Sequence, residues 1–389
     1  MKAEFIASVK HAIESVAGPQ CVLHAPIFRG NEQRYVSDCI ETGWVSSVGA
    51  YVDRLENDLA DFTGAKYVIA TSSGTSALHT ALVVAGVRPN DEVIVPSLSF
   101  VATANAVSYC GAVPHFADVD SQTYGLDPEK LRVQIETTMD KTSDGLKNLS
   151  TGRRVSAIVP MHTFGHPCSI RALCELAERY SLRVVEDAAE SLGSFYEGQH
   201  TGTFGTLGVL SFNGNKIATS GGGGAILTND STLAKTAKHL STTAKVPHPW
   251  HYVHDELGFN YRMPNLNAAL ACAQLEQIED FVRIKRDIAT LYSQAFESID
   301  GVSFFTESPR CTSNYWLNSI RLSVSKSECR DQLLAATNNA GVMTRPCWTP
   351  LNQLPMYQNC PSGSLTTTNA LSQQILNIPS GVGTFNINS

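Results

Sequence analysis

One lysine near the middle of this 389-residue chain stands in a setting that could support covalent chemistry. Lys216 follows an apolar run that ends at Phe212, and four consecutive glycines, Gly221–Gly224, come soon after it. Such a glycine run indicates backbone that turns sharply or that another group approaches closely. A lysine desolvated at the end of a strand can act as an amine nucleophile toward a carbonyl. The alternative, a solvated surface charge, stays open on this pattern alone.

Three carboxylates, Glu186, Asp187 and Glu190, lie at the end of a second apolar run that closes with Val184 and Val185. A carboxylate held at the edge of a sheet can pair with a cationic ligand nitrogen and stabilise its protonated form. Acidic residues also cap the N-termini of helices, so the cluster is equally compatible with a structural role.

Two further segments have the composition of binding loops. Thr71–Ser76 lies between a predicted strand and a predicted helix, where backbone N–H groups can surround a phosphate dianion. The same Ser, Gly and Thr residues are common in simple helix caps. Gly258–Pro264 is a polar turn that leads into a long helical pattern.

The elements that must position these residues alternate between short β-branched runs and helical segments from Lys66 to Leu227. This alternation predicts an α/β fold with a mostly parallel sheet that has helices on both faces. Ligands of such sheets bind at the carboxyl ends of the strands, where the segments above lie. Seven strands are expected, at Tyr67–Ala70, Val93–Val95, Val113–Phe116, Ser156–Pro160, Arg183–Val185, Gly208–Phe212 and Ala225–Thr228.

Beyond Thr228 the pattern changes. Pro264–Ser298 has the periodicity of one long helix that bridges two domains. A small α+β unit follows, with a strand at Asn318–Val324, a helix at Glu328–Asn339 and a strand at Val342–Trp348. We therefore expect two domains: residues 1–242 form an N-terminal segment and the large α/β domain, and residues 243–389 form the bridging helix and the small C-terminal domain.

The composition disfavours several classes of protein. With 29 basic and 36 acidic residues the net charge is −7, which gives nucleic acid little to bind. Because no apolar run approaches the length of a membrane span and the N-terminus has no features of a signal peptide, we expect a cytoplasmic chain that binds no membrane. The ten cysteines include no Cys-x-x-Cys pair, so buried free thiols are favoured over disulfides, and no metal site is expected.

Taken in order, five motifs resemble the pyridoxal-phosphate sugar aminotransferases of the DegT/StrS family. They are Ser72–Leu78, Pro96–Phe100, Glu186–Glu190, Ser211–Lys216 and Gly258–Met263, and the resemblance extends from about His24 to Pro379. It implies a fold-type I aminotransferase with a seven-stranded large domain and a small C-terminal domain. It also implies a homodimer whose active sites are shared across the subunit interface.

The resemblance implies a role for each matching residue. Lys216 matches the lysine that holds pyridoxal phosphate as a Schiff base and moves protons, and Asp187 matches the partner of the cofactor's ring nitrogen. The remaining cofactor contacts are the Gly74 and Thr75 amides, the Ser211 hydroxyl, Asn260 from the other subunit, Phe100 against the ring, and Glu190 near the ring hydroxyl. Weaker candidates for the sugar-nucleotide side are His162, Lys245, Tyr315, Trp316 and Arg345.

Within the family, Glu41–Ala50 and Ala244–Trp250 are similar to the 4-aminotransferases of bacillosamine and legionaminic acid synthesis. This similarity implies transfer of the amino group of L-glutamate to C4 of a UDP-linked 2-acetamido-2,6-dideoxy-4-keto-hexose. The alternative is a perosamine synthase, which acts on GDP-linked 4-keto-6-deoxymannose. Lys216 stands where a dehydratase of this fold has histidine, and the intact pair of Asp187 and Lys216 disfavours a non-catalytic regulator.

Overall fold

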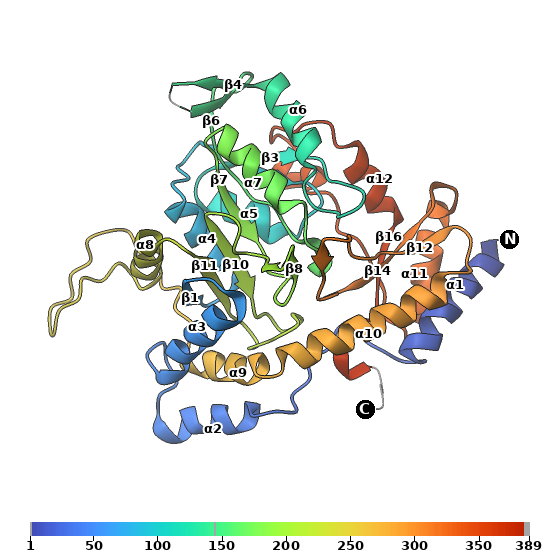
Figure 1. Ribbon diagram of the computed structural model, residues 1–389, viewed down its shortest axis with the longest axis horizontal. Coiled ribbons are helices and arrows are strands. Elements are labelled where there is room, and N and C mark those ends of the chain that lie inside the picture. Colours follow the sequence, from blue (N-terminus) through green and yellow to red (C-terminus); the bar gives the residue numbers. More distant parts are fainter. Residues whose placement is uncertain (1, 144, 385–389) are drawn as a thin grey trace.

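The computed structural model describes residues 2–143 and 145–384, and a mixed sheet lies at its centre (Figure 1). All seven expected strands are present and form the continuous path β1-β11-β10-β7-β6-β2-β3. Neighbours are parallel except β11, which runs antiparallel to both β1 and β10. The strands are β1 (Tyr67–Thr71), β2 (Glu92–Pro96), β3 (Val113–Ala117), β6 (Arg154–Ile158), β7 (Arg183–Asp187), β10 (Leu207–Ser211) and β11 (Gly224–Thr228).

Successive residues of these strands face opposite sides of the sheet, as the two-residue period of a strand requires. Val93 and Val95 pack into the apolar cluster on one face, whereas Ile94 belongs to the cluster on the other. Both faces are therefore buried, which explains why the strands are apolar along their whole length rather than alternating in polarity.

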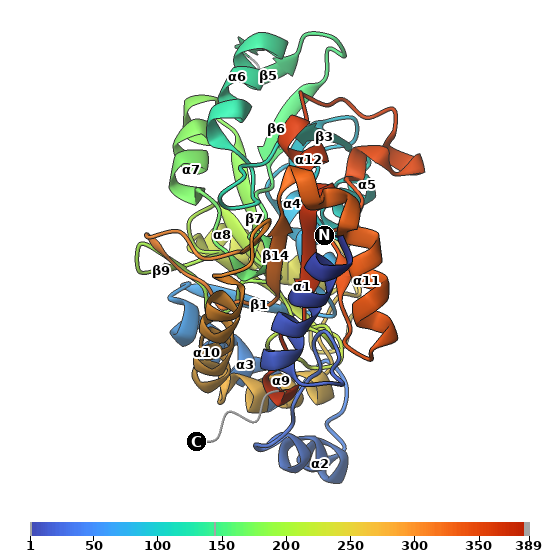
Figure 2. The ribbon, with the colours of Figure 1, turned by 90° about the vertical axis from the view of Figure 1, so that its right-hand side faces the viewer.

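Helices cover both faces (Figures 1 and 2). One face carries α4 (Gly74–Val84), α5 (Val101–Tyr109) and α8 (Ser231–Ser241), and the other carries α6 (Pro128–Thr138) and α7 (Ile170–Arg179). Asp127 caps the N-terminus of α6, because its carboxylate accepts hydrogen bonds from the Glu129 and Lys130 amides, and Pro128 follows it as the first helical residue.

The structure differs from expectation in the segment before β6. An antiparallel hairpin of β4 (Met139–Thr142) and β5 (Gly145–Asn148) extends the sheet, because β5 pairs with β6. Its strands are short and mostly polar, so their sequence has no apolar run that would predict them.

The long helix expected over Pro264–Ser298 is instead two helices, α9 (Asn265–Leu275) and α10 (Ile278–Phe296). The break falls at Glu276 and Gln277, whose side chains hydrogen-bond to Tyr35 and Glu32 respectively, both in α2 (Glu32–Thr42). These contacts with a distant part of the chain explain why helical periodicity alone does not show the break.

The C-terminal unit has a four-stranded antiparallel sheet in the order β12-β14-β16-β15. The strand expected over Val342–Trp348 shortens to two residues, and residues 385–389 of the expected domain lie outside the described part of the chain. Its elements are β12 (Val302–Phe304), β14 (Asn318–Leu322), α11 (Arg330–Asn339), β15 (Arg345–Pro346), α12 (Thr366–Gln374) and β16 (Ile375–Ile378).

The N-terminal helices link the two parts. α1 (Lys2–Ala17) packs against α10 and α11, and α2 and α3 (Ala50–Thr63) pack against α9. In the part of the chain that the structure describes, the remaining elements are small. They are the sheet β13-β8-β9, made of Cys311–Thr312, Phe195–Tyr196 and Gln199–His200, and the 3-10 helices η1 (Thr163–Gly165), η2 (Val324–Cys329), η3 (Leu351–Gln353), η4 (Pro355–Tyr357) and η5 (Val382–Thr384).

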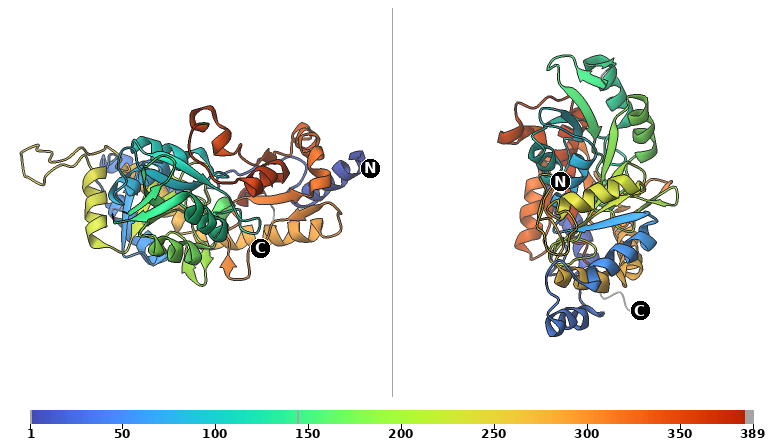
Figure 3. Two further views of the ribbon diagram at one scale, coloured as in Figure 1. Left: turned by 90° about the horizontal axis from the view of Figure 1, so that it is seen from above. Right: turned by 90° about the vertical axis from the view of Figure 1, so that its left-hand side faces the viewer.

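A long segment after α8 projects from the body of the molecule, which is clearest from above (Figure 3). We call residues 243–258 the arm. Among its apolar side chains, Trp250 is 73%, Tyr252 80% and Leu257 88% exposed. Within the described residues, none of the helices has the length and apolar character needed to cross a bilayer.

Candidate active site

A cavity of about 620 Å³ opens at the carboxyl ends of β1, β7 and β10. It brings together Gly74, Thr75, Phe100, Asp187, Glu190, Ser211 and Lys216, which the sequence had placed in one cofactor site. Trp316 and Arg345 from the C-terminal part complete the wall, so the cavity lies between the large sheet and the small unit. The order of the strands explains the convergence, since their carboxyl ends meet at one edge of the sheet.

The first wall of the cavity is the N-terminus of α4. Ser73 and Ser76 form a capping box there, each side chain accepting a hydrogen bond from the other residue's amide at 3.0 Å. The first amides of a helix have no partner within it, so those of Gly74 and Thr75 are suited to an anion. A Cβ at Gly74 would lie only 2.8 Å from Ser211 Cβ and 3.0 Å from its hydroxyl oxygen.

That close approach tests whether the residues fit a phosphate group. Glycine leaves the space between the α4 amides and the Ser211 hydroxyl open, and an alanine side chain would fill it. Backbone amides, a hydroxyl donor and the positive end of a helix dipole are the donors that a phosphate requires. The residues present therefore fit the phosphate of pyridoxal phosphate.

Asp187, at the end of β7, is buried in the cavity wall. Thr103 of α5 donates its hydroxyl to Asp187 Oδ2 at 2.7 Å, and the Ala189 amide donates to Oδ1 at 3.3 Å. The Thr103 hydroxyl in turn lies 2.7 Å from that of Ser99. These bonds fix the orientation of a carboxylate that can pair with a cationic ring nitrogen.

Lys216 lies in the turn after β10, and its side chain is 11% exposed. Its ammonium nitrogen is 3.3 Å from Glu190 Oε1 and 3.9 Å from the centre of the Trp316 ring. The Trp316 indole N–H donates to the Asn215 carbonyl at 2.7 Å, which ties the aromatic ring to the turn that carries the lysine. The amine therefore projects into the cavity between a carboxylate and an aromatic face.

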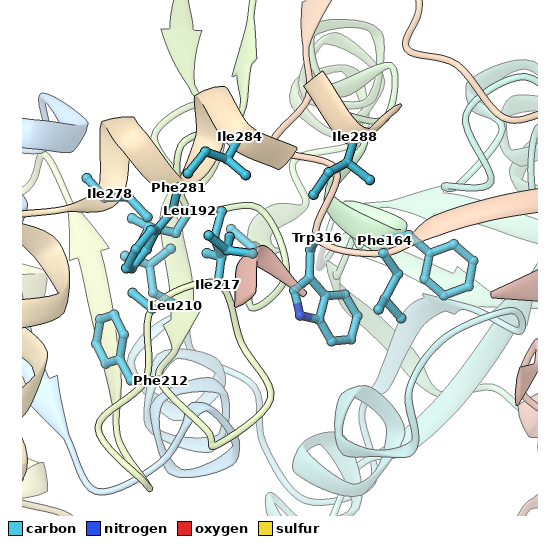
Figure 4. Packing of buried hydrophobic residues seen from close by; sticks show 14 of the residues in the cluster. Phe164, Leu192, Leu210, Phe212, Ile217, Ile278, Phe281, Ile284, Ile288 and Trp316 are labelled. Atoms are coloured by element: carbon cyan, nitrogen blue, oxygen red, sulfur yellow. The ribbon is translucent and has the colours of Figure 1, made fainter. Parts of the chain in front are cut away.

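The core beneath this turn is apolar (Figure 4). Ile284 and Ile288 of α10 pack over Ile217 and Trp316, so the helix supports both the residue after the lysine and the ring beside it. Lys285, on the same helix, is fully buried and donates to the Trp316 carbonyl at 3.0 Å. Burial lowers the pKa of Lys285 to about 7.

Glu190 is 2% exposed, and its burial raises its pKa to about 7. The Lys216 ammonium and the Phe164 amide oppose this rise, whereas the negative charge of Asp187 adds to it. Glu190 Oε2 accepts the Phe164 amide at 2.9 Å, and Oε1 faces Lys216. It is thus a carboxyl group that can gain or lose a proton near neutral pH.

The outer part of the cavity is aromatic and cationic. Phe100, immediately before α5, is 48% exposed, and its ring lies 6.4 Å from that of Trp348. Arg345 lines the cavity from the C-terminal sheet, and its guanidinium donates to Asn338 Oδ1 at 2.9 Å. This part of the cavity can accept a flat ring and an anionic group.

Two residues expected on the sugar side lie elsewhere. His162 is fully buried outside the cavity lining, where its Nε2 faces Glu186 Oε2 at 3.0 Å and its Nδ1 accepts the Cys168 amide at 3.2 Å. Tyr315 is buried against the His166 ring, and its hydroxyl accepts the Glu307 amide at 3.2 Å. Neither side chain is free to contact a sugar in this cavity, because each is enclosed by other partners.

Two other expected residues lie outside this chain's own cavity. Asn260 is exposed, and Arg262 donates to its side-chain oxygen at 3.3 Å. Lys245 lies at the base of the arm, with its ammonium 3.9 Å from the centre of the Tyr252 ring. Neither lines the cavity that contains Lys216.

The sequence did not indicate several residues that the structure brings to the site. Thr103 of α5 hydrogen-bonds to Asp187. Met161 lines the cavity, as do Trp348 and Asn377 from the C-terminal part. Thr103 is four residues after Ser99, a helical spacing that could have drawn attention to the pair, but its contact with Asp187 spans 84 residues and has no local signal.

The chain is similar to known proteins of one enzyme family. Residues 26–386 match the model of the DegT/DnrJ/EryC1/StrS aminotransferase family, and the chain therefore belongs to that family. It is a nucleotide-sugar aminotransferase with a fold-type I architecture, and its cofactor is pyridoxal phosphate.

Individual relatives cover nearly the whole chain. The GDP-perosamine synthase of Caulobacter vibrioides is 36% identical over 94% of both chains, and that of Escherichia coli O157:H7 is 37% identical over 86% of both. A solved DegT/DnrJ/EryC1/StrS aminotransferase from Brucella abortus superposes with a TM-score of 0.82 at 29% identity, over 90% of both chains. The expected closeness to the bacillosamine and legionaminic acid enzymes is not confirmed by these relatives.

Proposed function

We propose that this protein transfers the amino group of L-glutamate to C4 of a GDP-linked 4-keto-6-deoxymannose. Two observations together support the proposal. Lys216 and Asp187 line one cavity, and relatives that are 36–37% identical to the chain are named GDP-perosamine synthase. The UDP-linked acetamido sugar favoured by the sequence has weaker support, because it depended on two local motifs, Glu41–Ala50 and Ala244–Trp250.

The chain's own residues would divide the work as follows. The α4 amides and the Ser211 hydroxyl bind the phosphate, Asp187 holds the ring nitrogen in its protonated form, and Phe100 covers the ring. Pyridoxal phosphate then supplies an electron sink and a temporary carrier for the amino group. Lys216 would hold the cofactor, and its amine would move a proton on and off the substrate carbon.

We also propose that two copies of the chain complete each site. The arm, with its exposed aromatic side chains, and Asn260 lie outside the cavity of their own chain, which supports a role against a second copy. An exposed apolar group of this kind marks an interaction surface. In this arrangement Asn260 would contribute to the neighbour's phosphate site.

A parallel substrate test addresses the choice of sugar. The purified protein is first converted with L-glutamate to its amino-loaded form, and GDP- and UDP-linked 4-keto-6-deoxy sugars are then added separately while the cofactor's visible absorbance is followed. Return of the starting spectrum with the GDP-linked sugar alone supports the proposal. Return with the UDP-linked sugar alone, or with neither, refutes it.

Subunit mixing addresses the shared site. Lys216→Ala and Asn260→Ala proteins, each of low activity, are mixed and allowed to exchange subunits. After exchange in an equal mixture, half of the dimers are hybrids. If the sites are shared, each hybrid has one intact site and one inactive site, so the mixture should recover about a quarter of wild-type activity. No recovery in a mixture shown to contain hybrids would contradict the shared site.

A further inference from the structure

Glu190 and Lys216 form an enclosed ion pair in the cavity wall. Glu190 Oε1 lies 3.3 Å from the lysine nitrogen, and the Trp316 ring covers that nitrogen from another side at 3.9 Å. The carboxyl group is buried, and the amine is nearly so. In such surroundings the charged pair loses hydration that it would keep in water, so a neutral pair of amine and carboxylic acid becomes competitive.

The second oxygen of Glu190 is held by an unusual backbone conformation. Phe164, in η1, has φ 58° and ψ 17°, in the left-handed region that a phenylalanine rarely adopts. Such a conformation is energetically costly and persists only where the surrounding structure enforces it. In this conformation the Phe164 amide donates to Glu190 Oε2 at 2.9 Å, while its carbonyl accepts the Leu317 amide at 3.3 Å.

The turn that contains Phe164 is itself fixed by His162. The imidazole joins the Glu186 carboxylate of β7 to the Cys168 amide, at 3.0 and 3.2 Å. Glu186 is anchored in addition by the amides of Gly202, Phe204 and Gly205. The strained amide is therefore part of a rigid scaffold, and that scaffold directs Glu190 Oε1 toward the lysine.

The geometry points to Glu190 as the proton partner of Lys216, a step that deepens and rests on the proposed aminotransferase function. In this step an N–H bond of the lysine ammonium breaks, an O–H bond forms on Glu190 Oε1, and the lysine becomes a neutral amine. The net charge of the pair is unchanged and no electrons are gained or lost. In the reverse transfer the O–H bond on Glu190 Oε1 breaks, and the proton returns to the lysine nitrogen.

The charged groups around the pair are consistent with such a transfer. Asp187 acts on Glu190 from β7 and raises its pKa, and the Phe164 amide lowers it. Cys347, which follows β15, and His24, near the N-terminus, are close enough for their own protonation to respond to Glu190 and Lys216 respectively. With its pKa raised to about 7, Glu190 can take up or release a proton near neutral pH.

The direct test measures the reactivity of Lys216 in the full-length protein before the cofactor is added. The chain is treated with trace acetic anhydride at a series of pH values, and mass spectrometry gives the labelling rate of Lys216 relative to exposed lysines. If the pair shares a proton, the Lys216 rate rises in two steps, the lower one near pH 7. A single step in the wild-type protein refutes the proposal without any variant.

Substitutions then assign the lower step. Glu190→Gln keeps the side-chain size and an oxygen that can accept the Phe164 amide, but it cannot take a proton, so the lower step should vanish. Glu178→Gln makes the same change on the exposed face of α7 and should leave both steps in place. If the lower step persists in Glu190→Gln, Glu190 is not the proton partner.

The loaded enzyme gives a second readout. Its reaction with L-glutamate should slow by about 100-fold or more in Glu190→Gln, the range that a proton-transfer group contributes, and Glu190→Asp should recover part of the rate. A residue with only a structural role would weaken cofactor binding but leave the shape of the pH profile unchanged. Because this half-reaction needs no sugar, it remains informative if the GDP-linked substrate proves wrong.

Discussion

Replacing Thr103 by valine isolates the hydrogen bond that holds Asp187. The two side chains have nearly the same shape, and Thr103 is fully buried in α5, so the substitution removes the hydroxyl without opening a large cavity. Asp187 Oδ2 then loses its 2.7 Å donor, whereas the Ala189 amide still donates to Oδ1 at 3.3 Å. Ser99 keeps a partner, because its hydroxyl lies 3.0 Å from Met161 Sδ.

The size of the effect follows from the charge on the acceptor. A hydrogen bond to an ionised group contributes about 1.5–3 kcal/mol, against about 1 kcal/mol for a neutral pair. We therefore expect Thr103→Val to lower the free energy of unfolding by about 2 kcal/mol. Because the freed carboxylate can rotate away from the ring nitrogen, cofactor affinity should also fall, by about tenfold for each 1.4 kcal/mol lost.

Thr80→Val is the matched control. Thr80 is also fully buried in a helix, but its hydroxyl donates at 2.9 Å to the Ser76 carbonyl of the preceding turn, which already accepts the Thr80 amide. This variant should lose less than about 1 kcal/mol and bind the cofactor normally. Denaturant unfolding of both proteins measures the free energy of unfolding, and cofactor titration measures the affinity for the cofactor. Equal losses in the two variants, or an unchanged cofactor affinity in Thr103→Val, would refute the positioning role.

Two further predictions follow from the cavity wall and from α10. Gly74→Ala should weaken cofactor binding by at least about tenfold, because its Cβ would lie 2.8 Å from Ser211 Cβ; Gly214→Ala, with no atom within 4 Å of its Cβ, should bind normally, and similar affinities would count against the cradle. Lys285 has a pKa of about 7 in the folded state, below its ordinary value of 10.5, so above pH 7 the unfolded chain holds more protons. Its contribution to stability should then rise with pH from about 7 to 10.5, by about 5 kcal/mol in all. Lys285→Met should remove that rise in denaturant unfolding curves, and an unchanged slope would exclude Lys285 as its source.

The fold could be predicted because its strands are apolar on both faces and its helices carry strong local signals such as the Asp127 cap. The hairpin β4–β5 was missed since its polar strands depend on pairing with β6. The break at Gln277 was missed because its cause is a contact with Glu32, far away in the sequence.

In the site, too, some residues could be predicted from local sequence and others depend on contacts with distant parts of the chain. Residues at strand ends, such as Asp187 and Ser211, could be predicted because a parallel sheet gathers its carboxyl ends at one edge. His162 also follows a strand, but its side chain turns into the core to meet Glu186. Nothing in the local sequence distinguishes these two directions, since they depend on which partner the folded chain places beside the residue.

The residue to which the cofactor attaches tests the assignment of the active site most directly. The purified protein is loaded with pyridoxal phosphate, reduced with borohydride to make the linkage permanent, digested and analysed by mass spectrometry. We predict the added mass on Lys216, the amine that projects into the cavity beside Asp187 and the α4 amides. Attachment to another lysine, or no attachment at all, would contradict the central claim.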